Sequence, residues 1–276
     1  MKQDIRIIAL DLDGTLLNSN KELTERSYRA LEEAARRGIE IVPTTGRFYN
    51  AMPQVIRDLP FVNYAITING AQVANIHTGE VLYRAEIPWQ RAVELMTFLD
   101  TLPVVYDCFM DNAAFMTTAL QERIDEHTDD PHYRKMVRQL RQGVPELKSF
   151  ITQRQQDIQK SQFFTMDMEL RSRMMREIPQ RFPDLIATAA LKHNVELNDV
   201  RANKGAAVLA LAEHLGYGAE NIMSFGDGLN DLSMIEAAGL GVAMANAFDE
   251  VKAVANYITD DCDHDGVAAA IEKFCF

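Results

Sequence analysis

The sequence has few cysteines, an excess of acidic over basic residues, and no long apolar run. Its three cysteines, Cys108, Cys262 and Cys275, form no CxxC pair, which favours reduced thiols over a disulfide framework. Lys and Arg number 28 against 40 Asp and Glu, so the net charge is -12 at pH 7. Because a surface of that sign repels polyanions, neither nucleic acid nor an anionic membrane is an expected partner.

No segment approaches the roughly 18 apolar residues that a membrane-spanning helix needs. Near the amino terminus, Asp4, Arg6, Asp11 and Asp13 interrupt any apolar stretch that could act as a signal peptide. These absences predict a cytoplasmic protein. A chain of 276 residues, 47% of them hydrophobic, can form a large core and about two domains.

The chain opens on an apolar run, Ile7–Leu10, that ends in two carboxylates and a glycine. Such a run is typical of a buried parallel strand. Because side chains alternate along a strand, Asp11 and Asp13 are expected on the same side, and Gly14 lets the chain turn away. For this pair alone, a strand end with a turn-forming Asp-Gly is an equally good interpretation.

Strands and helices alternate in the first 70 residues and again after residue 203, which is typical of a doubly wound parallel sheet. We expect strands over 5–10, 39–43, 64–68 and 221–225, and helices over 23–37, 52–59 and 204–215. Ligands of such sheets bind where the strands end.

Between these stretches the alternating rhythm is lost, and hairpins and helices interleave, including a hairpin expected over 185–197. This pattern favours a separate α+β module. We place the inserted module at 84–191 and the two parts of the core at 1–83 and 192–276. The predicted fold class is α/β, a doubly wound core with an inserted α+β domain.

Four predicted element ends carry polar groups: Asp11 with Asp13, then Thr45, then Lys204, then Asp227 with Asn230 and Asp231. Taken singly, each of these residues can be explained by a structural role without a functional site. Thr45 can be a turn residue, Lys204 a solvated lysine, and Asp231 a helix N-cap. Together and in this order, they are better explained by one functional site.

In order and type, these motifs resemble the haloacid dehalogenase superfamily of phosphohydrolases. The DxDGT motif is Asp11–Thr15, the second motif is Thr45, the third is Lys204, and the fourth, GDxxND, is Gly226–Asp231. The core motifs carry this resemblance, which extends over nearly the whole chain.

Finer features are similar to the Cof-like phosphatases of subclass IIB. They include Thr45-Gly46-Arg47, Asn69-Gly70-Ala71 and Asn203-Lys204-Gly205. The insertion has the position and size of the α/β cap of that subclass, which sets substrate specificity. In the cap itself only the size and the mixture of strands and helices match.

The resemblance implies a phosphohydrolase of small phosphorylated metabolites, either sugar phosphates or nucleotide and cofactor monophosphates. It implies that Asp11 attacks phosphorus to give an aspartyl-phosphate, and that Asp13 acts first as general acid and then as general base. Asp13 must then start protonated, a state that a neighbouring carboxylate and limited solvation would favour.

Two carboxylates facing a phosphate would repel it, so a cation is required. The resemblance implies Mg²⁺ held by Asp11, the backbone carbonyl of Asp13, and Asp227, since Mg²⁺ prefers oxygen ligands. Lys204 would be a second cation, placed near a helix start against the charge that develops on the phosphoryl group.

The phosphoryl oxygens are expected to bond to Thr45, to the backbone amides of Leu12 and Gly46, and to Asn230. Thr44 precedes Thr45, and the sequence leaves open which hydroxyl is the main ligand.

Three further residues are expected at the site. Asp231 would orient Lys204 or a metal-bound water, and Asn69 should lie near the substrate because it ends a core strand. Arg47 either contacts the substrate or pairs with a nearby acidic residue.

Two alternatives to the hydrolase remain: a phosphosugar mutase of similar architecture, and a regulator that binds a phosphometabolite without turnover. The chain is expected to be a monomer or a small homo-oligomer.

Overall fold

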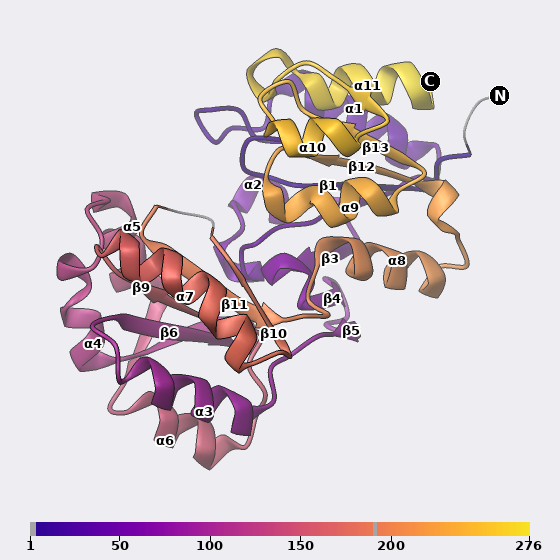
Figure 1. Ribbon diagram of the computed structural model, residues 1–276. Helices are drawn as coiled ribbons and strands as arrows, with labels where there is room; N and C mark the ends of the chain where they lie inside the picture. Colours follow the sequence, from indigo (N-terminus) through magenta and orange to yellow (C-terminus); the bar gives the residue numbers. More distant parts are fainter. Residues whose placement is uncertain (1–3, 190–191) are drawn as a thin grey trace. The chain divides into compact units, whose positions relative to one another are not determined.

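The computed structural model describes residues 4–189 and 192–276, and the chain divides into two compact units. The core unit comprises the chain up to Arg84 together with Ala202–Phe276, and the insert unit comprises Ala85–Arg201 (Figure 1). The predicted fold class, a doubly wound core with an inserted α+β domain, is confirmed.

The core unit is built on a five-stranded parallel sheet in the order β14-β13-β12-β1-β2. Its strands are β1 (Ile7–Leu10), β2 (Glu40–Pro43), β12 (Ile222–Gly226), β13 (Leu240–Ala243) and β14 (Tyr257–Ile258). Since β1 lies between β12 and β2, with Ile7 opposite both Ile222 and Glu40, the residues that follow β1 leave the middle of the sheet edge.

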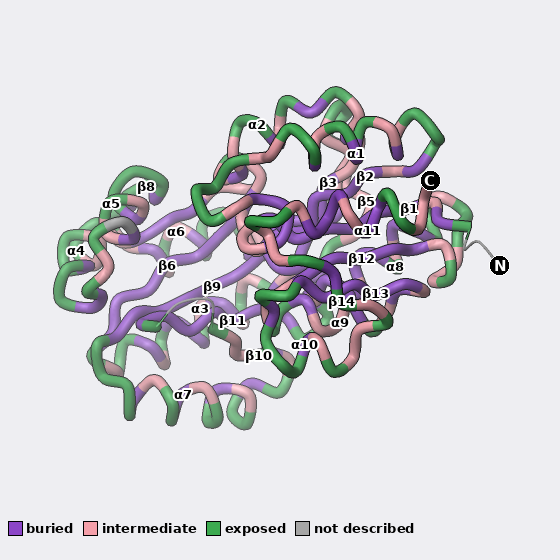
Figure 2. Tube along the Cα trace, turned by 90° about the horizontal axis from the view of Figure 1, so that it is seen from above, coloured by how far each residue is buried: buried purple, intermediate pink, exposed green. Residues whose placement is uncertain are grey.

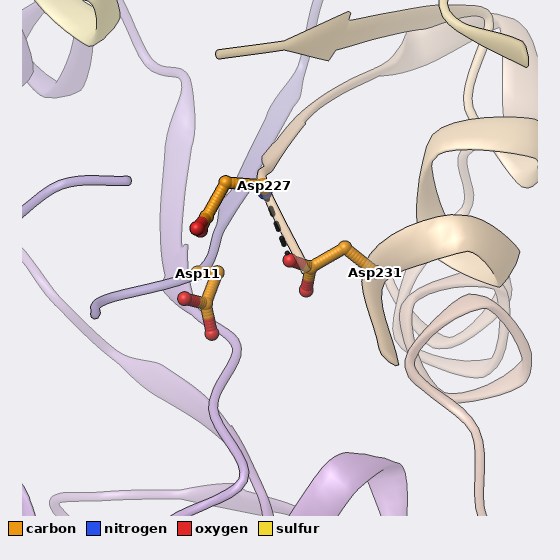
Figure 3. Close-up of side chains that lie close together, drawn as sticks. All are labelled: Asp11, Asp227 and Asp231. Atoms are coloured by element: carbon orange, nitrogen blue, oxygen red, sulfur yellow. Dashed lines mark hydrogen bonds between the residues drawn. The ribbon is translucent and has the colours of Figure 1, made fainter. Parts of the chain in front are cut away.

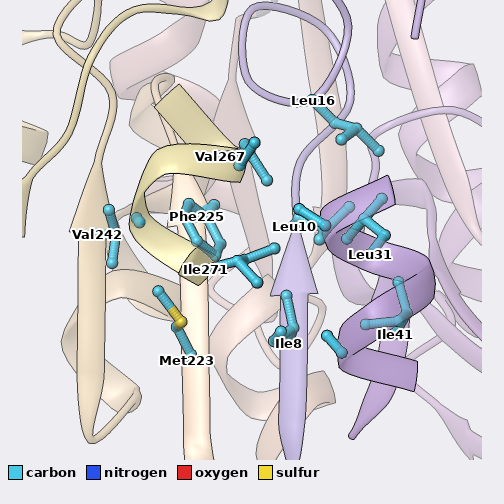
Figure 4. Close-up of a cluster of buried hydrophobic side chains, with 14 of the residues drawn as sticks. Ile8, Leu10, Leu16, Leu31, Ile41, Met223, Phe225, Val242, Val267 and Ile271 are labelled. Atoms are coloured by element: carbon cyan, nitrogen blue, oxygen red, sulfur yellow. The ribbon is translucent and has the colours of Figure 1, made fainter. Parts of the chain in front are cut away.

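Helices cover both faces of this sheet. On one face, Ile8 and Leu10 pack against Leu31 of α1 (Glu25–Arg36) and Ile271 of α11 (Gly266–Cys275) (Figure 4). On the other face, Ile7 and Ala9 pack with apolar residues of α8 (Lys204–His214). The central strands are therefore buried along their length, as Figure 2 shows. Two shorter helices, α9 (Leu232–Ala237) and α10 (Asp249–Val254), complete this part of the fold.

The first helix and α8 begin at side-chain caps. Thr24 accepts a hydrogen bond from the amide of Ser27, and Asn203 accepts one from the amide of Ala206 at 2.8 Å. Such caps satisfy amides that the first helical turn leaves without backbone partners. The Asn203 cap also fixes Lys204 as the first residue of α8.

The helix predicted over 52–59 is wrong in length. The structure has a 3₁₀ turn, Tyr49–Ala51, and a single helical turn, α2 (Gln54–Arg57). Pro53 separates them, and a proline can neither donate its backbone hydrogen bond nor continue the preceding turn.

The strand predicted over 64–68 does run parallel to the segment that follows β2, since its bridge to Thr44 is parallel, but it is not one of the five strands of the core sheet. β3 (Tyr64–Thr67) forms a separate antiparallel sheet with β4 (Gln72–Asn75) and β5 (Val81–Arg84), and meets the parallel sheet through a single bridge between Ile66 and Thr44. The chain reverses after Thr67 because Ile68, Asn69 and Gly70 have φ angles of 53°, 58° and 93°.

The insert unit contains a six-stranded sheet in the order β10-β11-β9-β6-β7-β8, antiparallel except for the β7–β8 pair. Its strands are β6 (Val105–Met110), β7 (Ala113–Thr117), β8 (Arg141–Val144), β9 (Lys160–Phe164), β10 (Leu185–Thr188) and β11 (Asn194–Asp199). Its helices are α3 (Trp89–Leu99), α4 (Thr118–Glu122), α5 (Pro131–Leu140), α6 (Leu147–Arg154) and α7 (Met168–Arg181).

The carboxyl-side boundary of the insert differs from the predicted 191/192. The structure divides the chain after Arg201, because β11 pairs with both β9 and β10 and so belongs to the insert sheet. The predicted boundary would cut through the β10–β11 hairpin. The other boundary falls one residue later than predicted, between Arg84 and Ala85.

Among the described residues, none of the helices has both the length and the apolar character needed to cross a membrane.

Candidate active site

A buried lysine joins two carboxylates at the carboxyl end of the parallel sheet. Asp11 follows β1 directly, and its amide donates to the carbonyl of Phe225 in β12. The ammonium of Lys204 donates to Asp11 Oδ1 and to Asp231 Oδ1, both at 2.6 Å. The lysine side chain is completely buried, so a solvated lysine is excluded.

Burial and neighbouring charges have opposite effects on the pKa values of Asp11 and Lys204. Burial raises the pKa of Asp11, and the charge of Lys204 opposes that rise without cancelling it. For Lys204, burial acts to lower the pKa, but the two carboxylates outweigh it and hold the pKa above its ordinary value. Lys204 is therefore a fixed positive charge beside one oxygen of Asp11.

The third carboxylate comes from the loop after β12. Asp227 accepts a hydrogen bond from the Thr15 hydroxyl at 2.7 Å. Burial, reinforced by the charge of Asp11, raises the pKa of Asp227 to about 6. The nearest oxygens of Asp11, Asp227 and Asp231 all lie within 4.8 Å of one another (Figure 3).

Asp231 already has partners on both oxygens. Its Oδ2 accepts from the amide of Asp227 at 3.0 Å (Figure 3) and from that of Gly228 at 2.9 Å, while its Oδ1 accepts from Lys204. Asp231 therefore contacts both Lys204 and the loop that carries Asp227. Its carboxylate does not act as a helix N-cap, because it accepts no hydrogen bond from the amides of the following helix, α9. The role of Asp231 in orienting Lys204 stays a prediction, and this contact supports it.

The acidic cluster fits a divalent cation. Asp11 and Asp227 are close, hard oxygen donors whose charged forms are disfavoured by burial, so a bound cation would stabilise both. The Asp13 carbonyl, also expected as a ligand, lies two residues beyond Asp11 in the same loop.

Asp13 lies in a different electrostatic environment. Arg47 donates from Nε and Nη2 to its two oxygens at 2.7 and 2.9 Å, and Lys21 Nζ is 3.0 Å from Oδ1. Burial acts to raise the pKa of Asp13, but the hydrogen bonds and charges of Arg47 and then Lys21 outweigh it, so the pKa is lowered. Two cations thus stabilise the ionised form of Asp13, which works against the protonated starting state expected from the resemblance.

Of the two interpretations of Arg47, the pair with an acidic residue is present, because its guanidinium binds Asp13, while the contact with substrate stays a prediction. Its third nitrogen, Nη1, donates to the carbonyl of Ala51 at 2.9 Å. Arg47 is thus held from both sides.

The two adjacent threonines differ in what their hydroxyls contact. The Thr44 hydroxyl is fully buried and donates to the carbonyl of Val42. The Thr45 hydroxyl accepts from the amide of Arg47, at the loop where β2 has ended. Thr45 is therefore better placed than Thr44 to meet a ligand at this edge.

Asn69 connects two loops that carry expected site residues. Its Oδ1 accepts from Nδ2 of Asn230 at 3.2 Å, and a Cβ on Gly46 would lie 2.7 Å from the same oxygen. Residue 46 must be glycine for Asn69 to approach so closely. The left-handed conformation of residues 68–70 brings Asn69 close to Gly46 and Asn230. Leu12, which lies between Asp11 and Asp13, is completely buried.

Three residues at the site received no role from the sequence. Thr15 positions Asp227, Lys21 contacts Asp13, and Asn246 donates to the carbonyl of Gly14 at 2.8 Å and to Asp227 Oδ2 at 3.5 Å. Thr15 lies within the first motif and Asn246 follows a core strand, so both had a signal in the sequence. Lys21 had none.

Comparison with known proteins identifies the family. The model of haloacid dehalogenase-like hydrolases matches residues 8–271. The chain belongs to this family. It is 31% identical to the 5-amino-6-(5-phospho-D-ribitylamino)uracil phosphatase YcsE of Bacillus subtilis, over 98% of this chain and 96% of the relative. It is 30% identical to the pyridoxal phosphate phosphatase YbhA of Escherichia coli, over 96% of this chain and 97% of the relative.

The fold comparison agrees with the sequence comparison. A haloacid dehalogenase-like hydrolase from Bacteroides thetaiotaomicron matches with a TM-score of 0.82 and 27% identity, over 98% of this chain and 99% of that one. The predicted membership and enzyme class are confirmed: the protein is a haloacid dehalogenase-type phosphatase, a phosphoric monoester hydrolase of small phosphorylated metabolites.

Proposed function

We propose that this phosphatase works through an aspartyl-phosphate on Asp11, with Mg²⁺ as its cofactor. The observation that carries the proposal is the environment of Asp11. Its Oδ1 is bonded to the buried Lys204, while its Oδ2 accepts no hydrogen bond from any described residue. One oxygen is thus oriented by a fixed cation and the other is available to attack phosphorus.

In the first step, Asp11 attacks phosphorus and the bond from phosphorus to the alcohol oxygen breaks. The departing oxygen takes a proton from Asp13, which must first bind one against the influence of Arg47 and Lys21. In the second step, Asp13 removes a proton from a water molecule, which attacks the aspartyl-phosphate and releases inorganic phosphate. The ion pairs of Asp13 with Arg47 and Lys21 suit this second step, because they stabilise the ionised carboxylate that serves as base.

Asp11, Asp227 and the backbone carbonyl of Asp13 are the proposed ligands of Mg²⁺. When bound, Mg²⁺ supplies positive charge that offsets the repulsion between the carboxylates and the phosphate. Thr45, Asn230, the amides of Leu12 and Gly46, and Lys204 are the proposed phosphoryl-binding groups.

The substrate is proposed to be a sugar phosphate or a nucleotide or cofactor monophosphate. The two relatives described above are named for different phosphorylated metabolites, which supports a shared phosphoryl chemistry with a variable leaving group. We propose that the insert unit supplies the residues that recognise this variable part.

The test is release of inorganic phosphate from a panel of sugar phosphates, nucleotides and an aryl phosphate, with Mg²⁺ and with EDTA. We expect release only with Mg²⁺, and none from Asp11→Asn. Asp58→Asn, at the C-cap of α2 in the same unit, is the matched control and should retain activity. A folded Asp11→Asn variant that hydrolyses its substrate normally would overturn the nucleophile.

The panel also separates the alternatives. A mutase would need a phosphosugar activator and would leave the phosphate on carbon. A non-catalytic regulator would be thermally stabilised by a phosphometabolite and release no phosphate.

A further inference from the structure

Lys21 lies in a tight loop that aims its side chain at the active site. The side chain of Asn18 accepts hydrogen bonds from the amides of Asn20 and Glu22, and the carbonyl of Asn18 accepts from the amide of Lys21. Lys21 itself has a φ angle of 64°. A left-handed conformation is unfavourable for a residue with a Cβ, so the loop imposes it.

The contact between Lys21 and Asp13 is additional to a complete ion pair. Arg47 alone donates to both oxygens of Asp13, and it is anchored by Ala51. Lys21 reaches Oδ1 at 3.0 Å with a side chain that is 55% exposed, against 34% for Arg47. An ammonium has three donors, and that of Lys21 has no other described partner, so it can accept another anion.

Lys21 also differs from the other cation of the site. Lys204 is fully buried and committed to Asp11 and Asp231. In a chain with a net charge of -12, an anionic substrate depends on local cations rather than on the overall field. Among the described residues around Asp13, Lys21 is the most exposed cation.

The position of Asp13 indicates which part of a substrate Lys21 would meet. A group that protonates the leaving oxygen must come within about 2.6–3.2 Å of it. Since Lys21 Nζ is 3.0 Å from Asp13 Oδ1, the ammonium can lie within about 6 Å of that leaving oxygen.

We propose that Lys21 binds an anionic substituent on the alcohol part of the substrate, so that the enzyme prefers phosphate monoesters with a carboxylate or second phosphate close to the ester oxygen. The inference rests on the proposed function, because it takes Asp13 as the residue that faces the leaving group. Lys21 would then determine specificity from the core unit, in addition to the substrate-recognising residues proposed for the insert unit.

The test compares two esters of similar size, 3-carboxyphenyl phosphate and 3-carbamoylphenyl phosphate, which differ in charge. Each is measured as a substrate and as a competitive inhibitor of the best substrate of the panel, so that slow turnover does not hide binding. The enzymes are the wild type, Lys21→Gln, Lys21→Arg and Lys273→Gln. Lys273 is the matched control because its described contacts are the rings of Tyr257 and Phe274.

We expect the wild type to favour the carboxylate ester about five- to ten-fold in kcat/KM, as for a hydrogen bond to a charged group at a partly exposed site. Lys21→Gln should abolish this preference by raising KM or the inhibition constant for the carboxylate ester alone. Lys21→Arg should restore it, and Lys273→Gln should leave it unchanged. Added salt should weaken the preference of the wild type.

Two failures are distinguishable. If the wild type hydrolyses phosphate esters but shows no preference, or if Lys21→Gln weakens both esters equally, the role of Lys21 is overturned and the proposed function stands. If the wild type releases no phosphate from any ester, the proposed function fails, and the inference fails with it.

Discussion

The two units of the molecule bury charge in different ways. In the core unit, the buried cation Lys204 lies at the end of the parallel sheet, between carboxylates of two loops. In the insert unit, buried ion pairs lie on the sheet itself. Arg141 Nε is 2.8 Å from Asp107 Oδ2, and Lys160 Nζ is 2.8 Å from Glu196 Oε1.

We interpret this difference as one between charges that serve the proposed chemistry and charges that support a fold. Asp11 keeps one oxygen without a described partner, so its ion pair leaves a reactive group available. Asp107 also has an oxygen, Oδ1, without a described partner, but its side chain is completely buried, and its Oδ2 accepts from Arg141 of β8 and Gln162 of β9. We therefore expect broken charge pairs in the core unit to reduce activity and broken pairs in the insert unit to reduce stability.

The largest expected effect is on activity, from Lys204→Met. This change removes the cation that opposes the charge developing on the phosphoryl group, and we expect kcat to fall by about 10³-fold. The matched control is Lys160→Met, which removes the other buried lysine with a carboxylate partner and should lower kcat less than about ten-fold. Equal losses in the two variants would remove the distinction between the units.

The next effect is on stability, from Arg141→Met. Removing one member of a buried pair leaves Asp107 charged without its main partner, and we expect a loss of about 3–5 kcal/mol in the free energy of unfolding. The double variant Asp107→Leu/Arg141→Met should recover most of it, because no buried charge remains. Trp89, the one tryptophan of the chain, lies in the insert unit, so its fluorescence during urea unfolding reports on this unit. A double variant less stable than Arg141→Met would contradict the argument.

A smaller effect tests the backbone behind the core site. Gly70 and Gly79 both have positive φ angles, but a Cβ on Gly70 would overlap the carbonyl of Asn203, whereas Gly79 has no atom within 4 Å of its Cβ position. We expect Gly79→Ala to cost about 1 kcal/mol from its conformation alone. Gly70→Ala should cost about 2–3 kcal/mol and should also lower kcat, because Lys204 follows Asn203. Urea unfolding and phosphate release measure the two effects, and identical costs would exclude the clash.

The same contrast explains how much could be predicted from the sequence. Asp11, Lys204 and Asp227 follow strands or begin a helix within contiguous motifs, so both their location and their chemistry could be recognised. The buried pairs of the insert join residues about 35 positions apart, such as Asp107 of β6 with Arg141 of β8, and only the assembled sheet brings them together.

Other features depend on backbone conformations without a sequence signal. A lysine at position 21 does not indicate a left-handed loop, and an isoleucine at position 68 does not indicate the reversal that pairs β3 with β4 in a second sheet. The partner of Arg47 stayed open because a sequence shows an available charge but not which carboxylate lies opposite. Because Asp13 is that partner, the stabilisation of its ionised form was not predicted either.

The smallest effect concerns the sign of a pH dependence. Burial, and then the charge of Arg123, lowers the pKa of His127 in the insert unit. In the core unit, the hydrogen bond and charge of Asp261 raise the pKa of the exposed His264. Below pH 6.5 the unfolded chain binds a proton at residue 127 more readily than the folded chain, so His127 reduces stability as the pH falls. His264 has the opposite sign, and its contribution is lost as the pH rises.

His127→Gln should therefore make the urea midpoint, followed by Trp89 fluorescence, less sensitive to acidification between pH 7.5 and 5.5. His264→Gln is the counterpart of opposite sign, and hydrogen exchange of peptides from β1 and β12 follows its unit. We expect its removal to lower protection at pH 5.5 and to have little effect at pH 7.5. If both variants shifted stability in the same direction on acidification, these histidines would not differ as the structure indicates. Burial would then not be the dominant influence on the pKa of His127, nor the carboxylate of Asp261 the dominant influence on the pKa of His264.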